Sequence, residues 1–186
     1  MSKDLDRLQS EFLRSGRLAG ASCSQLKSLI QSDSAFEAIS AAADCNAREL
    51  ADNIARQLDS PDAMIRWIAT ATLLTRFRMA QYANTGLRLA MNDPSLMVRC
   101  VAIVGLGEVI ASIQSSTERI AVAKFCVSVL RNPDFERGMR EAAYEAILAA
   151  SGIPAEKRGA LVDDIDLKSG VDSSQVDGFL KRFSES

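Results

Sequence analysis

The side chains that most often perform chemistry in proteins are absent or isolated in this chain. Its 186 residues include no histidine, which removes histidine-based proton transfer, histidine-activated nucleophiles and imidazole metal ligands. Glu141 and Glu145 form a carboxylate pair at helical spacing, a pattern that could supply an acid and a base for glycoside hydrolysis. Such pairs more often lie on a solvated helix face, here beside Arg137 and Arg140. We therefore predict no catalytic residue, no cofactor and no metal ion.

Cysteines and glycines give no stronger signal. Cys23, Cys45, Cys100 and Cys126 are widely spaced and form no CxxC pair. Three of them lie in apolar helical patterns, where a reduced cysteine behaves as a small hydrophobic residue, and this predicts core positions in a reducing compartment. The sequence has neither a P-loop nor a GxGxxG motif, and the glycines at 105 and 107 indicate close helix packing rather than a phosphate site.

The charge balance argues against a general attraction to phosphate or anionic lipid. The chain carries 22 Lys and Arg residues against 24 Asp and Glu residues, so no global field favours nucleic acid or a membrane surface. No window approaches the roughly 18 uninterrupted apolar residues that span a bilayer, and the N-terminus lacks the apolar core of a signal peptide. We predict a cytoplasmic protein that does not use a membrane.

Apolar composition and periodicity predict an all-α protein with an internal repeat. Apolar residues make up 47% of the chain and aromatic residues only 5%, which suits helix-on-helix packing. Three similar junctions, at residues 58–74, 91–107 and 131–148, each follow one helical segment and place a proline in the first turn of a second. The first helical segments are predicted at 47–58, 79–91 and 117–130. Arg66 and Arg99 are 33 residues apart, and Arg99 and Arg140 are 41 apart.

This helix, turn, helix unit resembles the HEAT repeat, in which an acidic residue at the turn precedes Val and Arg in the second helix. The middle copy matches best, with Asp93, Val98 and Arg99 at the pattern positions. The resemblance covers about residues 46–150. It implies a short right-handed α-α superhelix of about three to four helix pairs followed by C-terminal helices. It also implies that the turn acids and helix arginines form a structural ladder between repeats rather than an anion site; the residues concerned are Arg66, Asp93, Arg99, Asp134 and Arg140.

The second helix of the middle copy is apolar almost all the way round. Between Ser95 and Ile113 its only charged residues are Arg99 and Glu108, so one face needs a cover beyond its own helix pair. We predict that this face consists of Leu96, Cys100, Ile103, Gly107 and Ala111, and that equivalent positions extend it over the neighbouring copies. The predicted partner-binding residues on this concave face are Trp67, Thr70, Ile103, Glu141 and Tyr144.

Two covers for this face are possible. One is the chain's own C-terminal segment, with a short helix at 155–162 and an amphipathic helix at 174–183 whose stripe is Val176, Phe179, Leu180 and Phe183. The other is a protein partner anchored on Trp67 and Tyr144, residue types that often form binding hot spots. The predicted organisation is therefore residues 1–45 as N-terminal helices or a degenerate repeat, 46–153 as the repeats, and 154–186 as capping helices.

The function predicted from these patterns is a non-catalytic protein-binding module. Small size and mild acidity would also suit a stoichiometric inhibitor, such as a bacterial immunity protein that blocks a toxin. The alternative is a HEAT-like nucleic-acid-binding protein or DNA-glycosylase-type enzyme, for which Trp67, Tyr144 and four arginines (Arg66, Arg76, Arg78 and Arg88) supply some parts. Because the middle face is apolar and the chain is slightly acidic, nucleic acid is not the expected partner.

Overall fold

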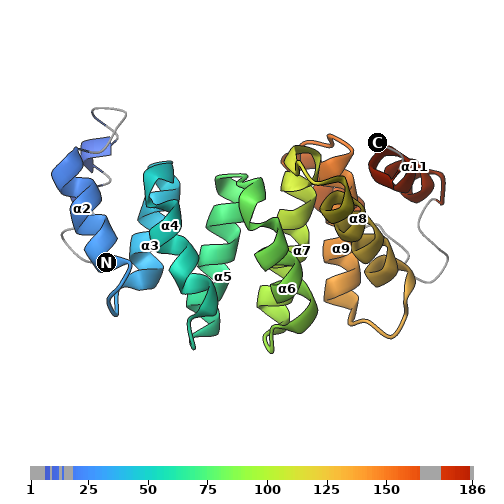
Figure 1. The fold of residues 1–186 in the computed structure, drawn as a ribbon, viewed down its shortest axis with the longest axis horizontal. Helices are drawn as coiled ribbons and strands as arrows, with labels where there is room; N and C mark the ends of the chain where they lie inside the picture. Colours follow the sequence, from blue (N-terminus) through green and yellow to red (C-terminus); the bar gives the residue numbers. More distant parts are fainter. Residues whose placement is uncertain (1–6, 9, 13, 15–18, 164–172, 185–186) are drawn as a thin grey trace. The chain divides into compact units, whose positions relative to one another are not determined.

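In the computed structural model every element of the described residues is helical, which confirms the all-α prediction (Figure 1). The structure describes residues 7–8, 10–12, 14, 19–163 and 173–184. The α-helices are α2 (Gly20–Leu29), α3 (Ala35–Asp44), α4 (Ala51–Ala55), α5 (Ala63–Thr70), α6 (Ala83–Asn92), α7 (Leu96–Val109), α8 (Ser116–Arg131), α9 (Arg137–Ala150), α10 (Ala155–Asp163) and α11 (Ser173–Ser184). Short 3-10 segments are η1 (Arg48–Leu50), η2 (Arg56–Asp59), η4 (Ala80–Tyr82) and η5 (Ile110–Ser112), and a π-helical segment, η3 (Ala71–Arg76), extends α5.

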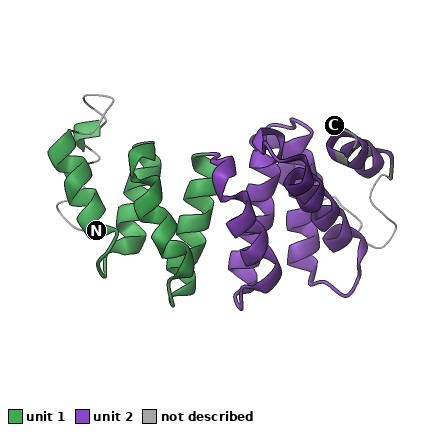
Figure 2. Cartoon of the chain, viewed as in Figure 1, with its two compact units in different colours: residues 1–77 green, residues 78–186 purple. Residues whose placement is uncertain are grey.

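The chain divides into two compact units, residues 1–77 and residues 78–186 (Figure 2). We call them unit 1 and unit 2. The division falls inside the segment 46–153 that the sequence predicts as one set of repeats. The three-part organisation with boundaries at 45/46 and 153/154 stays a prediction.

In unit 1 each helix packs on the next helix in the chain or on the one after it. The helix α3 contacts α2 and α5, and α4 contacts α5. Leu26, Ile39 and Ile54 are fully buried in the core of this unit. The helix predicted at 47–58 is present as η1, α4 and η2 in succession.

In its described residues, unit 2 contains the helix pairs α6 with α7 and α8 with α9, followed by α10 and α11 (Figure 1). The helix α7 packs on α6 and on α9, while α8 packs on α9. The helix α10 lies against α9, and α11 packs mainly against α8. The helices predicted at 79–91 and 117–130 are confirmed by η4 with α6 and by α8, and the two C-terminal helices are confirmed by α10 and α11.

The prolines of the repeat lie in the turns rather than in the first helical turn. Pro61 and Pro94 directly precede the N-cap positions of α5 and α7, and Pro133 lies three residues before that of α9. At α5 the cap is Asp62, whose carboxylate accepts from the Met64 amide at 2.7 Å. In the next turn Asp93 accepts from the Ser95 amide at 2.9 Å. The acids therefore close the turns by hydrogen bonds to the backbone, and proline only restricts the chain that leads into the helix.

The repeated arginines also bind turns. Arg66 is buried and donates from Nη1 to the Ser60 and Pro61 carbonyls at 2.8 and 3.0 Å. Arg140 Nε donates to the Leu130 carbonyl at 3.1 Å. Arg66 thus joins α5 to the turn before it, and Arg140 joins α9 to the last turn of α8, which supports a structural role.

The remaining ladder residues differ from one another in their surroundings. Arg99 extends to the next turn and pairs with Glu136 at 2.8 Å, two residues after the exposed Asp134. Asp93 is buried. The ladder of contacts from one repeat to the next stays a prediction at Arg66 and Arg140, since the contacts described above lie within their own helix pairs.

Candidate partner-binding surfaces

The most prominent aromatic feature of unit 1 is a stack between Phe36 on α3 and Trp67 on α5. The ring centroids are 6.4 Å apart and the ring planes differ by 13°. Both residues are half-buried, so part of this aromatic area faces solvent. Met64, one turn before Trp67 on α5, is 44% exposed. We call Phe36, Met64 and Trp67 the Trp67 surface.

Thr70 does not belong to the Trp67 surface, which corrects its assignment to the partner-binding face. Thr70 is buried, and its hydroxyl donates to the Arg66 carbonyl at 2.7 Å. The i, i+3 spacing from Trp67 predicted a shared face. However, the side chain is turned back onto its own helix, a common solution for a buried threonine that must satisfy its hydroxyl.

In unit 2, the middle of the predicted concave face of α7, from Cys100 to Gly107, packs against α9 and is not an open groove. A Cβ added at Gly107 would lie 2.4 Å from both the Cα and the carbonyl oxygen of Ala146 on α9. A Cβ at Gly138, also on α9, would lie 3.8 Å from Cys100 Sγ. Ile103 is fully buried. A residue buried in the folded chain cannot contact a partner, so the assignment of Ile103 was wrong.

The partly exposed side of α7 carries Met97, Val101, Val104 and Glu108, at i, i+4, i+7 and i+11. This stripe is displaced by one residue from the predicted one. The sequence did not mark this stripe as the solvent side, because its charged side chain, Glu108, is itself buried in an ion pair with Arg158.

Three large apolar side chains lie exposed around the turn between α6 and α7. Met91 is 57% exposed, Leu96 40% and Met97 39%. We call these three residues the Met91 surface. Methionine adapts its shape readily and is common on protein-binding surfaces, and sequence analysis missed Met91 and Met97 because it followed the apolar period of α7 alone.

Glu141 and Tyr144, the remaining predicted partner-binding residues, are half-buried on α9. Glu141 pairs with Arg137 at 2.6 Å, one turn earlier on the same helix. This is the contact expected of a solvated helix face, so the structure gives no support to an acid and base function for the Glu141 and Glu145 pair.

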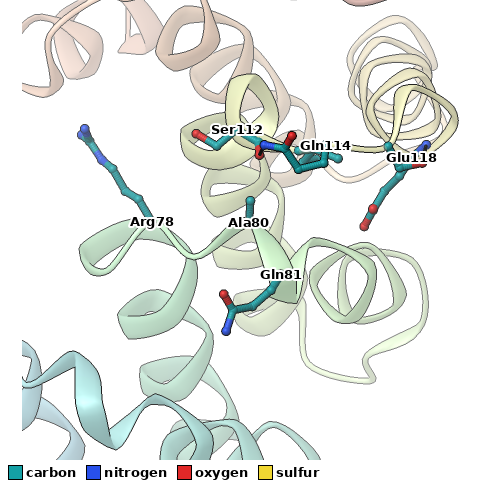
Figure 3. Close-up of a pocket in the computed structure, with 8 residues that line it drawn as sticks. Arg78, Ala80, Gln81, Ser112, Gln114 and Glu118 are labelled. Atoms are coloured by element: carbon teal, nitrogen blue, oxygen red, sulfur yellow. Dashed lines mark hydrogen bonds between the residues drawn. The ribbon is translucent and has the colours of Figure 1, made fainter.

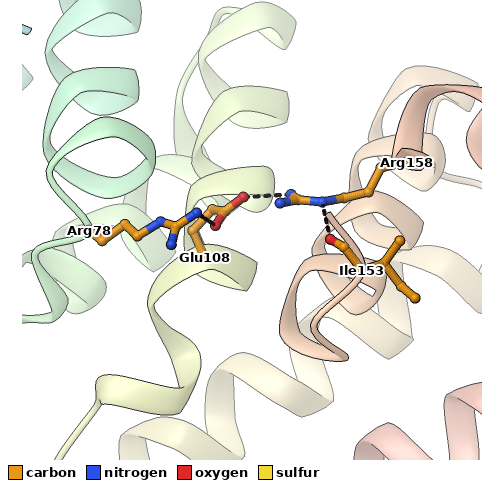
Figure 4. A network of polar contacts seen from close by, with 4 residues as sticks. All are labelled: Arg78, Glu108, Ile153 and Arg158. Atoms are coloured by element: carbon orange, nitrogen blue, oxygen red, sulfur yellow. Dashed lines mark hydrogen bonds and ion pairs between the residues drawn. The ribbon is translucent and has the colours of Figure 1, made fainter. Parts of the chain in front are cut away.

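A buried ionic network links α7 to α10 (Figure 4). Two arginines form ion pairs with the Glu108 carboxylate. Arg158 Nη1 lies 2.5 Å from Glu108 Oε1, and Arg78 Nη2 lies 3.0 Å from Glu108 Oε2. Arg158 is almost fully buried and also donates from Nε to the Ile153 carbonyl at 2.9 Å. Arg78 is 61% exposed. The network is a structural clamp, because its buried donors and acceptors are occupied by one another.

Glu145 lies close to this network and has a raised pKa. Burial is the largest cause of the raised pKa; the positive charge of Arg158 lowers the pKa and partly offsets burial, and the negative charge of Glu108 raises it further. A raised folded-state pKa means that the native protein binds more protons than the unfolded chain at intermediate pH, so stability falls as pH rises through that range. We expect Glu145→Gln to be more stable than the unsubstituted chain at pH 7, with a difference that disappears near pH 3, measured as melting temperature against pH.

Glu136 provides a control of opposite sign for this pH series. Hydrogen bonds from its own backbone amide and from Arg99 lower the pKa of the Glu136 carboxyl. Glu136→Gln should therefore be less stable than the unsubstituted chain at pH 7, and this deficit should disappear in acid. A pH-independent effect at Glu145 would mean that its charge does not oppose folding.

A shallow depression of about 530 Å³ lies beside the start of unit 2 (Figure 3). It is lined by residues of η4, η5 and α8 and of the segments beside them: Arg78, Ala80, Gln81, Ser112, Ile113, Gln114, Ser115 and Glu118. Arg78, the cation in this lining, is paired with Glu108. The depression holds no arrangement of nucleophile, acid and base.

Cysteine chemistry is also disfavoured among the residues that the structure describes. All four cysteines are free thiols, and Cys45 and Cys126 are buried. Burial raises the pKa of Cys126 to about 12 and, with Glu49 nearby, the pKa of Cys23 to about 11. Thiols with such high pKa values are poor nucleophiles at neutral pH.

The described residues contain no cluster of three or more His, Cys, Asp or Glu that could hold a metal ion. Within the same ranges, the helices are too short or too polar to cross a bilayer. Comparison of the chain with protein-family models, curated proteins and solved structures finds no match.

Proposed function

We propose that this chain is a non-catalytic protein-binding module and that the Trp67 surface is its principal contact. The observation that carries the proposal is the aromatic stack of Phe36 and Trp67, which is left half-buried beside the exposed Met64. Removing this apolar area from water on binding is favourable, and tryptophan is the residue most enriched at binding hot spots. The partner would offer an apolar side chain or helix face to it.

The packing of the helices supports a short α-solenoid of the HEAT type as the framework. Within unit 2, the second helices α7 and α9 pack on each other, and each packs on the helix before it. Such nearest-neighbour packing of helix pairs is the rule in solenoids. A framework of this kind displays residues on rigid helices, which reduces the ordering cost of binding.

Unit 2 offers two smaller contact areas, the Met91 surface and the half-buried Glu141 and Tyr144 on α9. The Met91 surface offers apolar area, and Glu141 and Tyr144 offer polar groups of the kind found at the rim of a protein interface. A stoichiometric inhibitor of another protein would be one form of this function.

The nucleic-acid alternative receives less support from the arginines on which it depends. Arg66 is buried against carbonyl oxygens. Arg78 pairs with Glu108 at 3.0 Å and Arg76 with Asp44 at 3.5 Å. Arginines that bind nucleic-acid phosphates displace the counterions of those phosphates. Arg66 is held by backbone oxygens and Arg76 and Arg78 pair with carboxylates, whereas Arg88 is exposed.

The proposal is tested by capturing partners from nuclease-treated host lysate with the full chain and with a Met64→Ala, Trp67→Ala variant. We expect a stoichiometric protein partner that the variant loses, with an affinity at least about tenfold weaker in a titration with the purified partner. Circular dichroism should show that the variant keeps its helical content.

Leu161→Ala is the matched control, because Leu161 is also a large exposed apolar residue, 42% exposed on α10 in unit 2. It should bind the partner as the unsubstituted chain does. Capture that requires nucleic acid, or a partner that binds the Trp67 variant equally well, would contradict the proposal.

A further inference from the structure

The helix α8 is buried on two sides. Its buried residues include Val122, Cys126 and Val129 in one helical row and Ala123, Val127 and Leu130 in the next. Two helices cover them, α9 from the same helix pair and α11 from the end of the chain. The place that α11 occupies is therefore an apolar groove on α8, with α9 at its edge.

The buried side chains of α11 show which kinds of side chain the groove accepts. Val176, Phe179 and Phe183, at i, i+3 and i+7, are buried there. The rings of Phe179 and Phe183 meet edge to face with centroids 5.2 Å apart.

Polar contacts fix the direction and register of α11. Asp177 pairs with Arg131, the last residue of α8, at 2.8 Å. Arg182 donates to the carbonyl of Ala150, the last residue of α9, at 3.0 Å.

Several features make α11 a weak ligand for this groove. A helix of 12 residues is at the lower limit of what forms in isolation. Gly178 lies in its middle, exposed, and a Cβ there would meet nothing within 4 Å, so glycine reduces helix propensity without a packing benefit. The Arg131 and Asp177 side chains are 52% and 65% exposed, and such ion pairs contribute little.

We propose that the groove on α8 is a second protein-binding surface, and that its partner is an amphipathic helix of another protein that displaces α11. The partner helix would carry large apolar residues at i, i+3 and i+7 and a carboxylate at i+1 facing Arg131. A helix with an apolar face laid in a groove is a common mode of peptide recognition. Because α11 is tethered, a partner must overcome an effective concentration on the order of millimolar, and the weak features of α11 make this possible. This surface is separate from the Trp67 surface, and the proposal does not depend on that one.

The probe for the test is a fluorescent peptide with the sequence of residues 173–184 carrying Gly178→Ala, titrated against the full chain by fluorescence anisotropy. Phe179→Ala in the chain weakens the tethered α11 and leaves the groove intact, so we expect the probe to bind about tenfold more tightly. Gly178→Ala in the chain strengthens α11, so the probe should bind about fivefold more weakly.

A second probe with Asp177→Lys tests the register. The ratio of the two probe affinities for one chain does not depend on the stability of the tethered α11, because both probes compete with the same helix. The unsubstituted chain should prefer the Asp177 probe by roughly threefold, and an Arg131→Glu chain should prefer the Lys probe.

Binding that follows both patterns supports the proposal. A Phe179→Ala chain that stays helical but does not bind the probe would overturn it, as would equal affinity for both probes on both chains. A Phe179→Ala chain that forms dimers and excludes the probe would identify a second copy as the occupant and would also overturn it. If Phe179→Ala disturbs folding, the Gly178→Ala and Arg131→Glu chains still test the proposal, because both substitutions are at exposed positions and their probe affinities can be measured in the same way.

Discussion

Replacing either Glu108 or Arg158 alone with methionine is expected to destabilise the protein by about 3 kcal/mol or more, whereas the double replacement should be nearly neutral. Each single substitution leaves an almost fully buried charge without its main partner, since Arg158 Nη1 lies 2.5 Å from Glu108 Oε1. The double substitution removes both charges and puts apolar volume in their place. Urea unfolding followed by circular dichroism would measure the difference.

Arg78→Met is the control for this cycle. Arg78 is the other arginine on Glu108, but it is 61% exposed, and exposed ion pairs contribute less than about 1 kcal/mol. If the double substitution costs the sum of the two single ones, the charges act independently and the network is not a clamp.

The single tryptophan adds a second readout. Trp67 lies in unit 1, whereas Glu108 and Arg158 lie in unit 2, so fluorescence reports on one unit while circular dichroism reports on both. Coincident transitions in the Arg158→Met variant would mean that the two units unfold together.

Gly107→Ala is expected to cost about 3 kcal/mol, although alanine is the better helix former. The added Cβ would lie 2.4 Å from two backbone atoms of Ala146, and a backbone cannot move aside as the end of a flexible side chain can. The whole of α9 would have to shift away from α7, which would loosen the core of unit 2. For a chain of this length, each kcal/mol corresponds to about 2–4 °C in melting temperature, so differential scanning calorimetry would resolve the loss.

Gly159→Ala is the matched substitution, because Gly159 is also helical but a Cβ there meets nothing within 4 Å. It should be neutral or stabilising by up to about 1 kcal/mol. If Gly107→Ala proved equally benign, α7 and α9 would not approach as closely as the structure shows.

These two sites explain why α7 can be apolar on nearly every side. Gly107 allows α9 to approach one face closely, and Glu108, the next residue, binds Arg158 from α10 on another. The stripe of Met97, Val101 and Val104 remains partly exposed. The middle of the face predicted to be a groove on α7 is thus filled by α9 of the next helix pair.

The sequence by itself determined the helical class, the positions of most helices, and the absence of histidine chemistry. These follow from local properties, namely apolar spacing, turn residues near Pro61, Pro94 and Pro133, and residue composition. The amphipathic stripe of α11 was also predictable, because polar residues alternate with Val176, Phe179 and Phe183 at a helical period.

Only the tertiary structure decided which face of α7 is covered and which remains at the surface. Between Ser95 and Ile113 the sequence has two charged residues, too few to mark a solvent side by periodicity. The choice was made by long-range contacts: Gly107 against Ala146, and Glu108 against Arg158. The same holds for Thr70 and Ile103, whose spacing placed them on a binding face but whose burial depends on neighbours that no local pattern specifies.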